Sequence, residues 1–297
     1  MGSFSVQKTS RHAKRTRKTR RAKRTGMSRN GGGRMTPQAT AIAIVDPCTL
    51  PSLKERVIAR IERQKPLLSG EGPTFCGTNE NIEQIVAGLR PTPDDRILAI
   101  CGSGDQAFAL AEYGARVYAV DNDPEQIAYA RQRATLLRQR RYDVFLSINR
   151  APPIIDASAM EGTIDYFTRK GCLTAVRSHV DRVSLHTADI FNLPEELKIE
   201  YTKAYLSNAH YYWGSSTHHE LHGVAERIVP GGIVYACGIL HDRLEDCCGL
   251  QEDRETTRQI ERLGDFGWKP TVYVKRSTTT ATPSSATPKS TTSRHGG

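Results

Sequence analysis

The sequence of 297 residues has no apolar run near the roughly 20 residues that a transmembrane helix needs, and its N-terminus lacks the apolar core of a secretory signal. Its seven cysteines are unevenly spaced, and no CxxC pair is present for zinc binding or redox chemistry. We therefore expect a soluble, cytoplasmic protein with reduced thiols. The same absences exclude membrane-spanning and disulfide-stapled classes of protein.

Acidic residues are absent from both ends of the chain. Residues 1–45 hold 12 of the 42 Lys and Arg residues and no Asp or Glu, and residues 275–297 hold 4 more bases and again no acid. The remaining 26 basic residues face all 32 acidic residues, so the middle of the chain has a net charge of −6, although the whole chain is at +10. We expect nucleic acid to be bound, if at all, only through the N-terminal end.

The two ends are also poor in core-forming residues. A basic block from Arg11 to Arg24 predicts a disordered arm over residues 1–47, and Ser and Thr dominate a second predicted disordered tail over residues 277–297. Residues 48–276 are expected to form one folded domain. For the arm, RNA binding, localisation, a transit peptide and no role at all remain open.

Helical and strand patterns alternate between these ends, which predicts an α/β fold with a mostly parallel sheet and helices on both faces. Two N-terminal helices are expected to form a lid, and residues 142–180 a helical insertion. The expected helices cover residues 53–64, 81–89, 106–113, 124–140, 217–228 and 255–263. The expected strands cover residues 96–101, 116–120, 183–186, 204–207, 233–237 and 271–274.

The most informative segment is the strand that ends at Cys101 and runs into Gly102-Ser103-Gly104, with Asp105 opening the next helix. Glycines at such a turn let the backbone approach a ligand closely, and the amides at the following helix start face it. Asp121 ends the next strand, 17 residues beyond Gly104, where a carboxylate accepts both hydroxyl hydrogens of a ribose. This pair predicts an adenosine-type ligand.

NAD and S-adenosyl-L-methionine both fit that pair, and two later segments favour the second. Ala188-Asp189-Ile190-Phe191 follows the next strand, where methyltransferase-like folds place an acid and an apolar residue around the adenine ring. Pro230-Gly231-Gly232 is similar to a turn between helix and strand in these enzymes. The sequence therefore predicts a Rossmann-like class I methyltransferase fold. The expected cofactor-binding residues are Cys101, Gly102, Ser103, Gly104, Asp105, Asp121, Asn122, Asp189 and Ile190.

The glycine loop departs from the usual Asp-x-Gly-x-Gly-x-Gly pattern, with Leu98 and Ile100 in place of the acid and the first glycine. Together with the segment from Val120 to Gln126 and with Leu206-Ser207-Asn208, the loop resembles the diacylglycerol 3-amino-3-carboxypropyltransferases of betaine-lipid synthesis. The likeness spans roughly residues 73–240. It implies that Gln126 and Ser207 also bind the cofactor. The segment 74–80 departs from that family at its cofactor lid, where only a cysteine and an acid are kept.

The group that is transferred depends on which carbon of the sulfonium the site presents to the nucleophile. The resemblance and the missing loop acid favour the 3-amino-3-carboxypropyl group, with a small-molecule or lipid-like acceptor. One alternative is a methyltransferase acting on a small molecule, with Asp105 or an outside residue in place of the loop acid. Another is an RNA-associated transferase or adapter that uses the basic arm.

Acceptor chemistry is expected beyond the strand 204–207, because ligands of open α/β sheets lie outside the carboxyl ends of the strands. Asn208, His210 and Tyr211 are the candidates to orient or deprotonate the nucleophile, although Tyr211 also fits a role in packing a loop with Tyr212 and Trp213. His218 and His222 share a helix face without a third ligand at a fitting spacing, so no metal site is expected. The sequence leaves the oligomeric state open.

Overall fold

The computed structural model describes residues 52–64, 73–148, 157–211, 217–238, 249–264 and 268–277. The predicted arm over residues 1–47 lies outside them, as does the predicted tail beyond Ser277. Both stay predictions.

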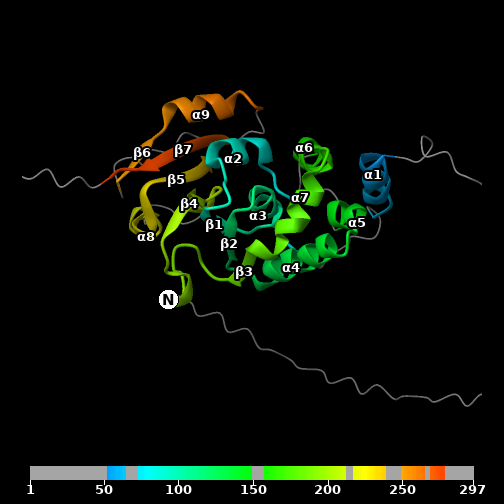
Figure 1. Cartoon of the computed structure of the whole chain (residues 1–297), viewed down its shortest axis with the longest axis horizontal. Coiled ribbons are helices and arrows are strands. Elements are labelled where there is room, and N and C mark those ends of the chain that lie inside the picture. Colours follow the sequence, from blue (N-terminus) through cyan, green and yellow to red (C-terminus); the bar gives the residue numbers. More distant parts are fainter. Residues whose placement is uncertain are drawn as a thin grey trace, which may run out of the picture. The chain divides into compact units, whose positions relative to one another are not determined.

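Seven strands form one sheet. They are β1 (Arg96–Ile100), β2 (Arg116–Asp121), β3 (Val183–Thr187), β4 (Tyr201–Tyr205), β5 (Ile228–Gly238), β6 (Leu250–Glu252) and β7 (Lys269–Lys275). Their order is β3-β2-β1-β4-β5-β7-β6 (Figure 1). The first five are parallel, whereas β7 runs antiparallel to β5 and β6 antiparallel to β7. The predicted mostly parallel, Rossmann-like sheet is confirmed.

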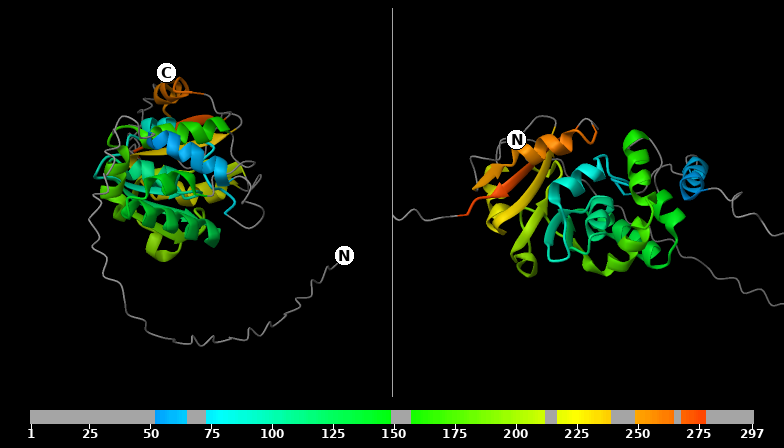
Figure 2. Two further views of the ribbon diagram at one scale, coloured as in Figure 1. Left: turned by 90° about the vertical axis from the view of Figure 1, so that its right-hand side faces the viewer. Right: turned by 45° about the horizontal axis from the view of Figure 1, so that its top comes forward.

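Nine α-helices are assigned in the described residues. They are α1 (Leu53–Gln64), α2 (Ile82–Leu89), α3 (Asp105–Ala111), α4 (Pro124–Arg138), α5 (Tyr142–Ser147), α6 (Ala157–Thr168), α7 (Cys172–His179), α8 (Thr217–Glu226) and α9 (Arg254–Glu261). Helices α5, α6 and α7 make up the predicted insertion, drawn in green in Figure 2. Helix α5 packs against α4, α7 packs against α3 and α4, and α6 packs against α1, α2 and α7.

Helix starts follow from local capping. Asn81 accepts the backbone N–H of Glu83 at 2.8 Å, and Asp123 accepts that of Glu125 at 2.9 Å with Pro124 in the first turn of α4. Both side chains satisfy amides that have no partner inside the helix. The Asp123 cap thus begins α4 just after the end of β2, and the Asn81 cap begins α2 just after the stretch 75–80.

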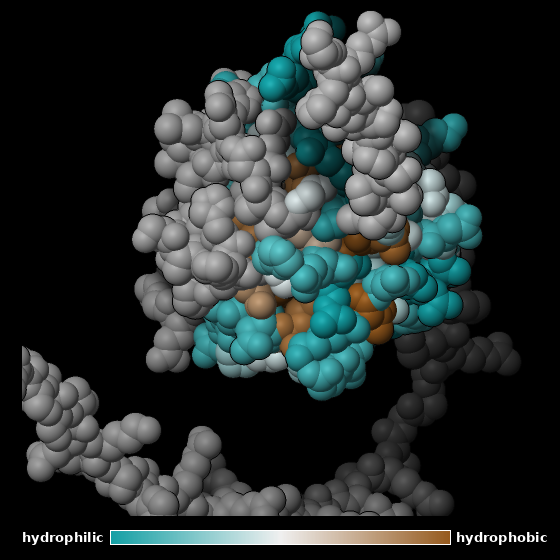
Figure 3. All heavy atoms as spheres, turned by 90° about the vertical axis from the view of Figure 1, so that its left-hand side faces the viewer, coloured by the Kyte–Doolittle hydropathy of each residue, from teal (hydrophilic) through white to brown (hydrophobic). Residues whose placement is uncertain are grey.

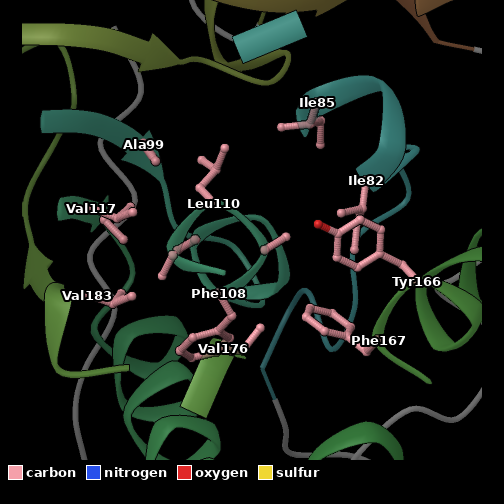
Figure 4. Close-up of a cluster of buried hydrophobic side chains, with 14 of the residues drawn as sticks. Ile82, Ile85, Ala99, Phe108, Leu110, Val117, Tyr166, Phe167, Val176 and Val183 are labelled. Atoms are coloured by element: carbon pink, nitrogen blue, oxygen red, sulfur yellow. The ribbon is translucent and has the colours of Figure 1, made fainter. Parts of the chain in front are cut away.

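The strands alternate their side chains between two buried clusters, as a pleated sheet requires. Ile97 and Ala99 of β1 join the cluster under α2, α3 and α7, whereas Leu98 joins the other cluster, under α8. Figure 4 shows side chains of the first cluster meeting between the sheet and the helices: Ile82, Ile85, Ala99, Phe108, Leu110, Val117, Tyr166, Phe167, Val176 and Val183. Helices therefore cover both faces.

The two N-terminal helices, which were expected to form a lid, belong to the hydrophobic core and do not line the pocket. Helix α2 approaches β5 so closely that a Cβ at Gly88 would lie 2.8 Å from Cδ2 of Tyr235. Val57 and Ile61 of α1 are buried in the same cluster. The covering segment is instead the stretch 75–80, just before α2.

Two sequence predictions on the second half of the sheet are wrong. Strand β4 covers Tyr201–Tyr205 rather than 204–207, because its start is polar: Lys203 is buried against Asp95, with 2.5 Å between Nζ and Oδ2. The segment Pro230-Gly231-Gly232 is no turn before a strand. It is a bulge inside β5, whose pairing passes from Tyr201↔Ile228 to Lys203↔Ile233. Strand β6 was not predicted.

Candidate active site

A cavity of about 380 Å³ opens at the carboxyl ends of the central strands. Its walls are the segments that follow β1, β2, β3 and β4, together with the stretch 75–80 before α2. The lining residues are Phe75, Gly77, Thr78, Asn79, Glu80, Ile100, Gly102, Ser103, Gln106, Asp121, Asn122, Ala188, Asp189, Ile190, Phe191, Ser207, Asn208 and Ala209. Three of them carry carboxylates and none is Lys or Arg, so this described wall is electronegative.

Asp121 stands at the end of β2 and is tied to the glycine loop. Its carboxylate accepts the backbone N–H of Gly102 at 2.9 Å and that of Asp123 at 3.1 Å. Burial raises the pKa of Asp121, and these two hydrogen bonds oppose the rise. Gly102 and Gly104 take left-handed φ values of 47° and 84°, which explains the glycines of this turn. The predicted ribose acid and the glycine loop therefore meet in one pocket.

The segment after β3 brings the predicted adenine-side residues to the same pocket. Asp189 accepts the backbone N–H of Phe191 at 2.9 Å, and Ile190 between them is buried. The backbone N–H of Ala188 bonds the carbonyl of Asp121 at 2.9 Å, which joins this segment to the end of β2.

Of the predicted cofactor residues, those that line the cavity are Gly102, Ser103, Asp121, Asn122, Asp189, Ile190 and Ser207. The predicted contacts Cys101, Gly104, Asp105 and Gln126 do not line it. Burial raises the pKa of the Cys101 thiol far above its usual range, so this group stays protonated.

Asp105 is occupied by a buried ion pair. Its carboxylate meets Nη2 of Arg133 at 2.6 Å, and both side chains are fully buried. It also accepts the Ser103 hydroxyl at 2.8 Å and the Thr78 backbone N–H at 3.1 Å. Asp105 thus joins the glycine loop to α4 and to the segment before α2.

Arg133 was missed because it lies in a helix rich in exposed charges, where burial is not visible in the pattern. Its guanidinium also donates to the Ser103 carbonyl at 2.7 Å and lies 4.4 Å from the ring centroid of Phe145.

The side-chain amide of Gln126 hydrogen-bonds the backbone of two residues in the pocket wall. Its amide donates to the Phe75 carbonyl at 2.6 Å and to the Gly102 carbonyl at 2.8 Å, and it accepts the Phe75 backbone N–H at 3.0 Å. Gln126 therefore lies next to the pocket, although it was predicted to bind the cofactor itself. Its contacts are with the backbone on both sides of the pocket rather than with the cavity.

Of the three candidate acceptor residues, Asn208 lines the cavity. His210 is buried in the 3₁₀ helix Ala209–Tyr211 and is outside the lining. The side chain of Tyr211 lies outside the described part of the chain, as do Tyr212 and Trp213.

Glu80 is a pocket residue that sequence reasoning did not single out. It is only 4% exposed, and its Oε1 accepts the hydroxyl groups of Tyr205, at 2.7 Å, and of Ser207. Burial raises the pKa of Glu80, while these hydrogen bonds work against the rise. The one available signal was the acid kept in the segment 74–80.

In the part of the chain that the structure describes, no three His, Cys, Asp or Glu side chains gather as a metal site would need. His222 is exposed and pairs with Glu226 at 3.0 Å. Within the same residues, no helix is both long and apolar enough to span a bilayer.

Residues 98–159 match the model of a protein family described as a methyltransferase domain. Among solved structures, a Haloferax volcanii methyltransferase in complex with the Trm112 methyltransferase activator is 15% identical, with 77% of this chain and 100% of that chain covered and a TM-score of 0.40. The N-methyltransferase NodS of Bradyrhizobium japonicum is 13% identical, covering 66% and 94%, with a TM-score of 0.41. An RNA methyltransferase of Salinibacter ruber in complex with S-adenosyl-L-homocysteine is 14% identical, covering 70% and 94%, with a TM-score of 0.36. No curated protein matches in sequence.

The sheet order, the pocket and the matched segment define an enzyme with the class I methyltransferase fold. It is a transferase that uses S-adenosyl-L-methionine, as predicted. The electronegative wall fits this cofactor, because its sulfonium and ammonium groups and its single carboxylate together give it a net positive charge. The relation to the aminocarboxypropyltransferases stays a prediction.

Proposed function

We propose that the protein transfers the methyl group of S-adenosyl-L-methionine to a small-molecule acceptor. The proposal is supported by the match of residues 98–159 to a methyltransferase domain, over the same loop and β2 end that line the cavity. An acceptor nucleophile attacks the methyl carbon, the carbon–sulfur bond breaks with its electron pair on sulfur, and S-adenosyl-L-homocysteine leaves as a neutral thioether.

The residues of this chain act by positioning, which is the main source of rate in such a displacement. Asp121 binds the ribose hydroxyl groups, and Asp189 with Ile190 holds the adenine side. Asn208, which follows β4 in the cavity lining, orients the acceptor through hydrogen bonds of its carboxamide, and the proton of the acceptor leaves to solvent. The enclosing stretch 75–80 excludes water from the reacting atoms.

A second candidate is transfer of the 3-amino-3-carboxypropyl group, which the resemblance implies. One observation favours it: Leu98, where the usual loop has its acid, is fully buried in the hydrophobic cluster under α8 and offers nothing to the amino-acid part of the cofactor.

The by-product distinguishes the two reactions. The purified protein is incubated with S-adenosyl-L-methionine and a protein-free small-molecule extract, and the nucleosides formed are identified by mass spectrometry. Methyl transfer releases S-adenosyl-L-homocysteine, whereas aminocarboxypropyl transfer releases 5′-methylthioadenosine. The variant D121A, which loses the ribose acid, controls for background. Release of 5′-methylthioadenosine alone, above that control, would overturn the methyl assignment.

A further inference from the structure

Two oxygen atoms in the pocket wall are left without partners. Oε2 of Glu80 and Oε1 of Gln106 are both buried and have no hydrogen-bond partner among the described residues. Both residues line the cavity. Unpaired buried acceptors are costly, and a pair of them in one pocket indicates a ligand that donates hydrogen bonds there.

The same few side chains hold both acceptors in place. The Tyr205 hydroxyl donates a hydrogen bond to Oε1 of Glu80 at 2.7 Å and accepts one from Nε2 of Gln106 at 3.2 Å. Gln106 also donates to the Thr78 hydroxyl at 2.8 Å, and Ser207 donates to Oε1 of Glu80. The Cys237 thiol also hydrogen-bonds the Glu80 carboxylate. In each residue, one atom of the polar group is thus held in place, whereas Oε2 of Glu80 and Oε1 of Gln106 have no hydrogen-bond partner within the described part of the chain.

The group that fits these oxygens is a cation. Among the described residues, no basic side chain pairs with the buried Glu80, and burial raises the pKa of its carboxyl group. The other nearby buried acid, Asp105, is neutralised by Arg133 and is thus not available to a ligand. Asp121 is assigned to the ribose hydroxyl groups in the proposed function, and each of its carboxylate oxygens also accepts one backbone amide.

We propose that Glu80 and Gln106 bind the α-ammonium group of the amino-acid part of S-adenosyl-L-methionine, and that Glu80 replaces the acid that the loop lacks at Leu98. The inference rests on the cofactor of the proposed function. The acid that binds the ammonium group would then come from the segment before α2, whereas the usual loop acid belongs to β1. An ammonium has three N–H donors, enough to satisfy both orphan oxygens.

The test compares two ligands that share the adenosine part. S-adenosyl-L-homocysteine carries the ammonium, and 5′-methylthioadenosine lacks the amino-acid part beyond the thioether. Affinities of both are measured by calorimetry for the wild type and for Glu80→Gln. We expect the substitution to weaken S-adenosyl-L-homocysteine about 10- to 100-fold, the range for a lost charged hydrogen bond, and to change 5′-methylthioadenosine less than about threefold.

The matched control is Glu83→Gln, since Glu83 is an exposed acid on α2 three residues away. It should leave both affinities unchanged. The conservative variant Glu80→Asp should retain part of the preference for S-adenosyl-L-homocysteine.

Each other result overturns the inference in a distinct way. Equal weakening of both ligands by Glu80→Gln would make Glu80 a structural residue. Unchanged affinity for both ligands would exclude Glu80 from binding the amino-acid part of the cofactor. If the wild type binds neither ligand, the proposed function fails with it.

Discussion

At the scale of single residues, the ionisation of Glu80 gives cofactor binding a pH dependence. The ammonium pairs with the carboxylate form, so lowering the pH through the raised pKa of Glu80 should weaken S-adenosyl-L-homocysteine. The other titratable groups that face Glu80 are Tyr205 of β4 and Tyr235 and Cys237 of β5, and burial raises the pKa of all three, which keeps them neutral.

This pH dependence is measured as the ratio of the two ligand affinities. Asp121 acts on the shared adenosine part, so its titration cancels in the ratio of S-adenosyl-L-homocysteine to 5′-methylthioadenosine. The ratio should fall several-fold as the pH is lowered and stay flat in Glu80→Gln. A ratio that is equally flat in the wild type contradicts the ion pair.

The ionised carboxylate of Glu80 should also lower the free energy of unfolding of the protein. Because burial raises the folded-state pKa of Glu80, the folded protein holds a proton at pH values where the unfolded chain has already released it. Stability therefore decreases as the pH rises from the unfolded pKa through the folded one, and the loss is complete above that window. Glu80→Gln removes the ionisation and should raise the Tm of the ligand-free protein at neutral pH, where each gain of about 1 kcal/mol in the free energy of unfolding appears as about 2–4 °C.

Scanning calorimetry of the ligand-free protein measures this, with Glu83→Gln as the control. A gain in Tm together with weaker ligand binding is the pattern of a residue kept for function at the expense of stability. A lower Tm would show that Glu80 holds the wall together.

At the scale of structural elements, the glycine loop depends on the ion pair between α3 and α4. Asp105→Asn leaves the fully buried Arg133 without its countercharge, and such a loss costs about 3–5 kcal/mol of unfolding free energy. Urea denaturation is the measurement. The control is Asp181→Asn, whose partner Arg138 is half-exposed at 49%, and where the change should stay below about 1 kcal/mol. Similar losses in the two variants would mean that the Asp105 pair is not buried in solution.

The elements that the sequence predicted are those whose signals are local. Pro124 and Asp123 mark the start of α4, and the apolar run of β1 stands out by itself. Strand β4 was misplaced because its Lys203 is neutralised by Asp95, more than a hundred residues earlier. A buried ion pair of this kind leaves no trace in the periodicity of either segment.

The candidate site followed the same rule. The loop, Asp121 and the segment after β3 were predicted, since each directly follows a strand whose carboxyl end forms the pocket. Asp105 and Gln126 were predicted to bind the cofactor, but the structure places both outside the cavity lining, because the sequence does not tell which side of a turn a side chain takes. Glu80 comes from outside the sheet, so only the folded chain brings it beside Ser207.

At the scale of the whole molecule, charge is divided along the chain. The segment 46–274 carries the acidic surplus, and the lining of the pocket in it holds three carboxylates and no Lys or Arg. On the face shown in Figure 3, hydrophilic side chains predominate among the described residues, and hydrophobic ones show in small areas between them. Neither feature favours nucleic acid, which needs a basic groove or stacking aromatic residues.

Any RNA affinity should therefore come from the basic block Arg11 to Arg24, which holds nine Lys and Arg residues. We expect the full-length protein to bind a short single-stranded RNA with an affinity that falls steeply with salt, by a slope of about 0.7 per phosphate neutralised. A full-length variant with these nine residues replaced by Gln should lose that affinity at least about tenfold, while its affinity for S-adenosyl-L-homocysteine stays unchanged. Filter binding at several salt concentrations and calorimetry measure the two. RNA affinity that survives the replacement would mean that the acidic body binds RNA, and the acceptor would then be sought among RNAs rather than small molecules.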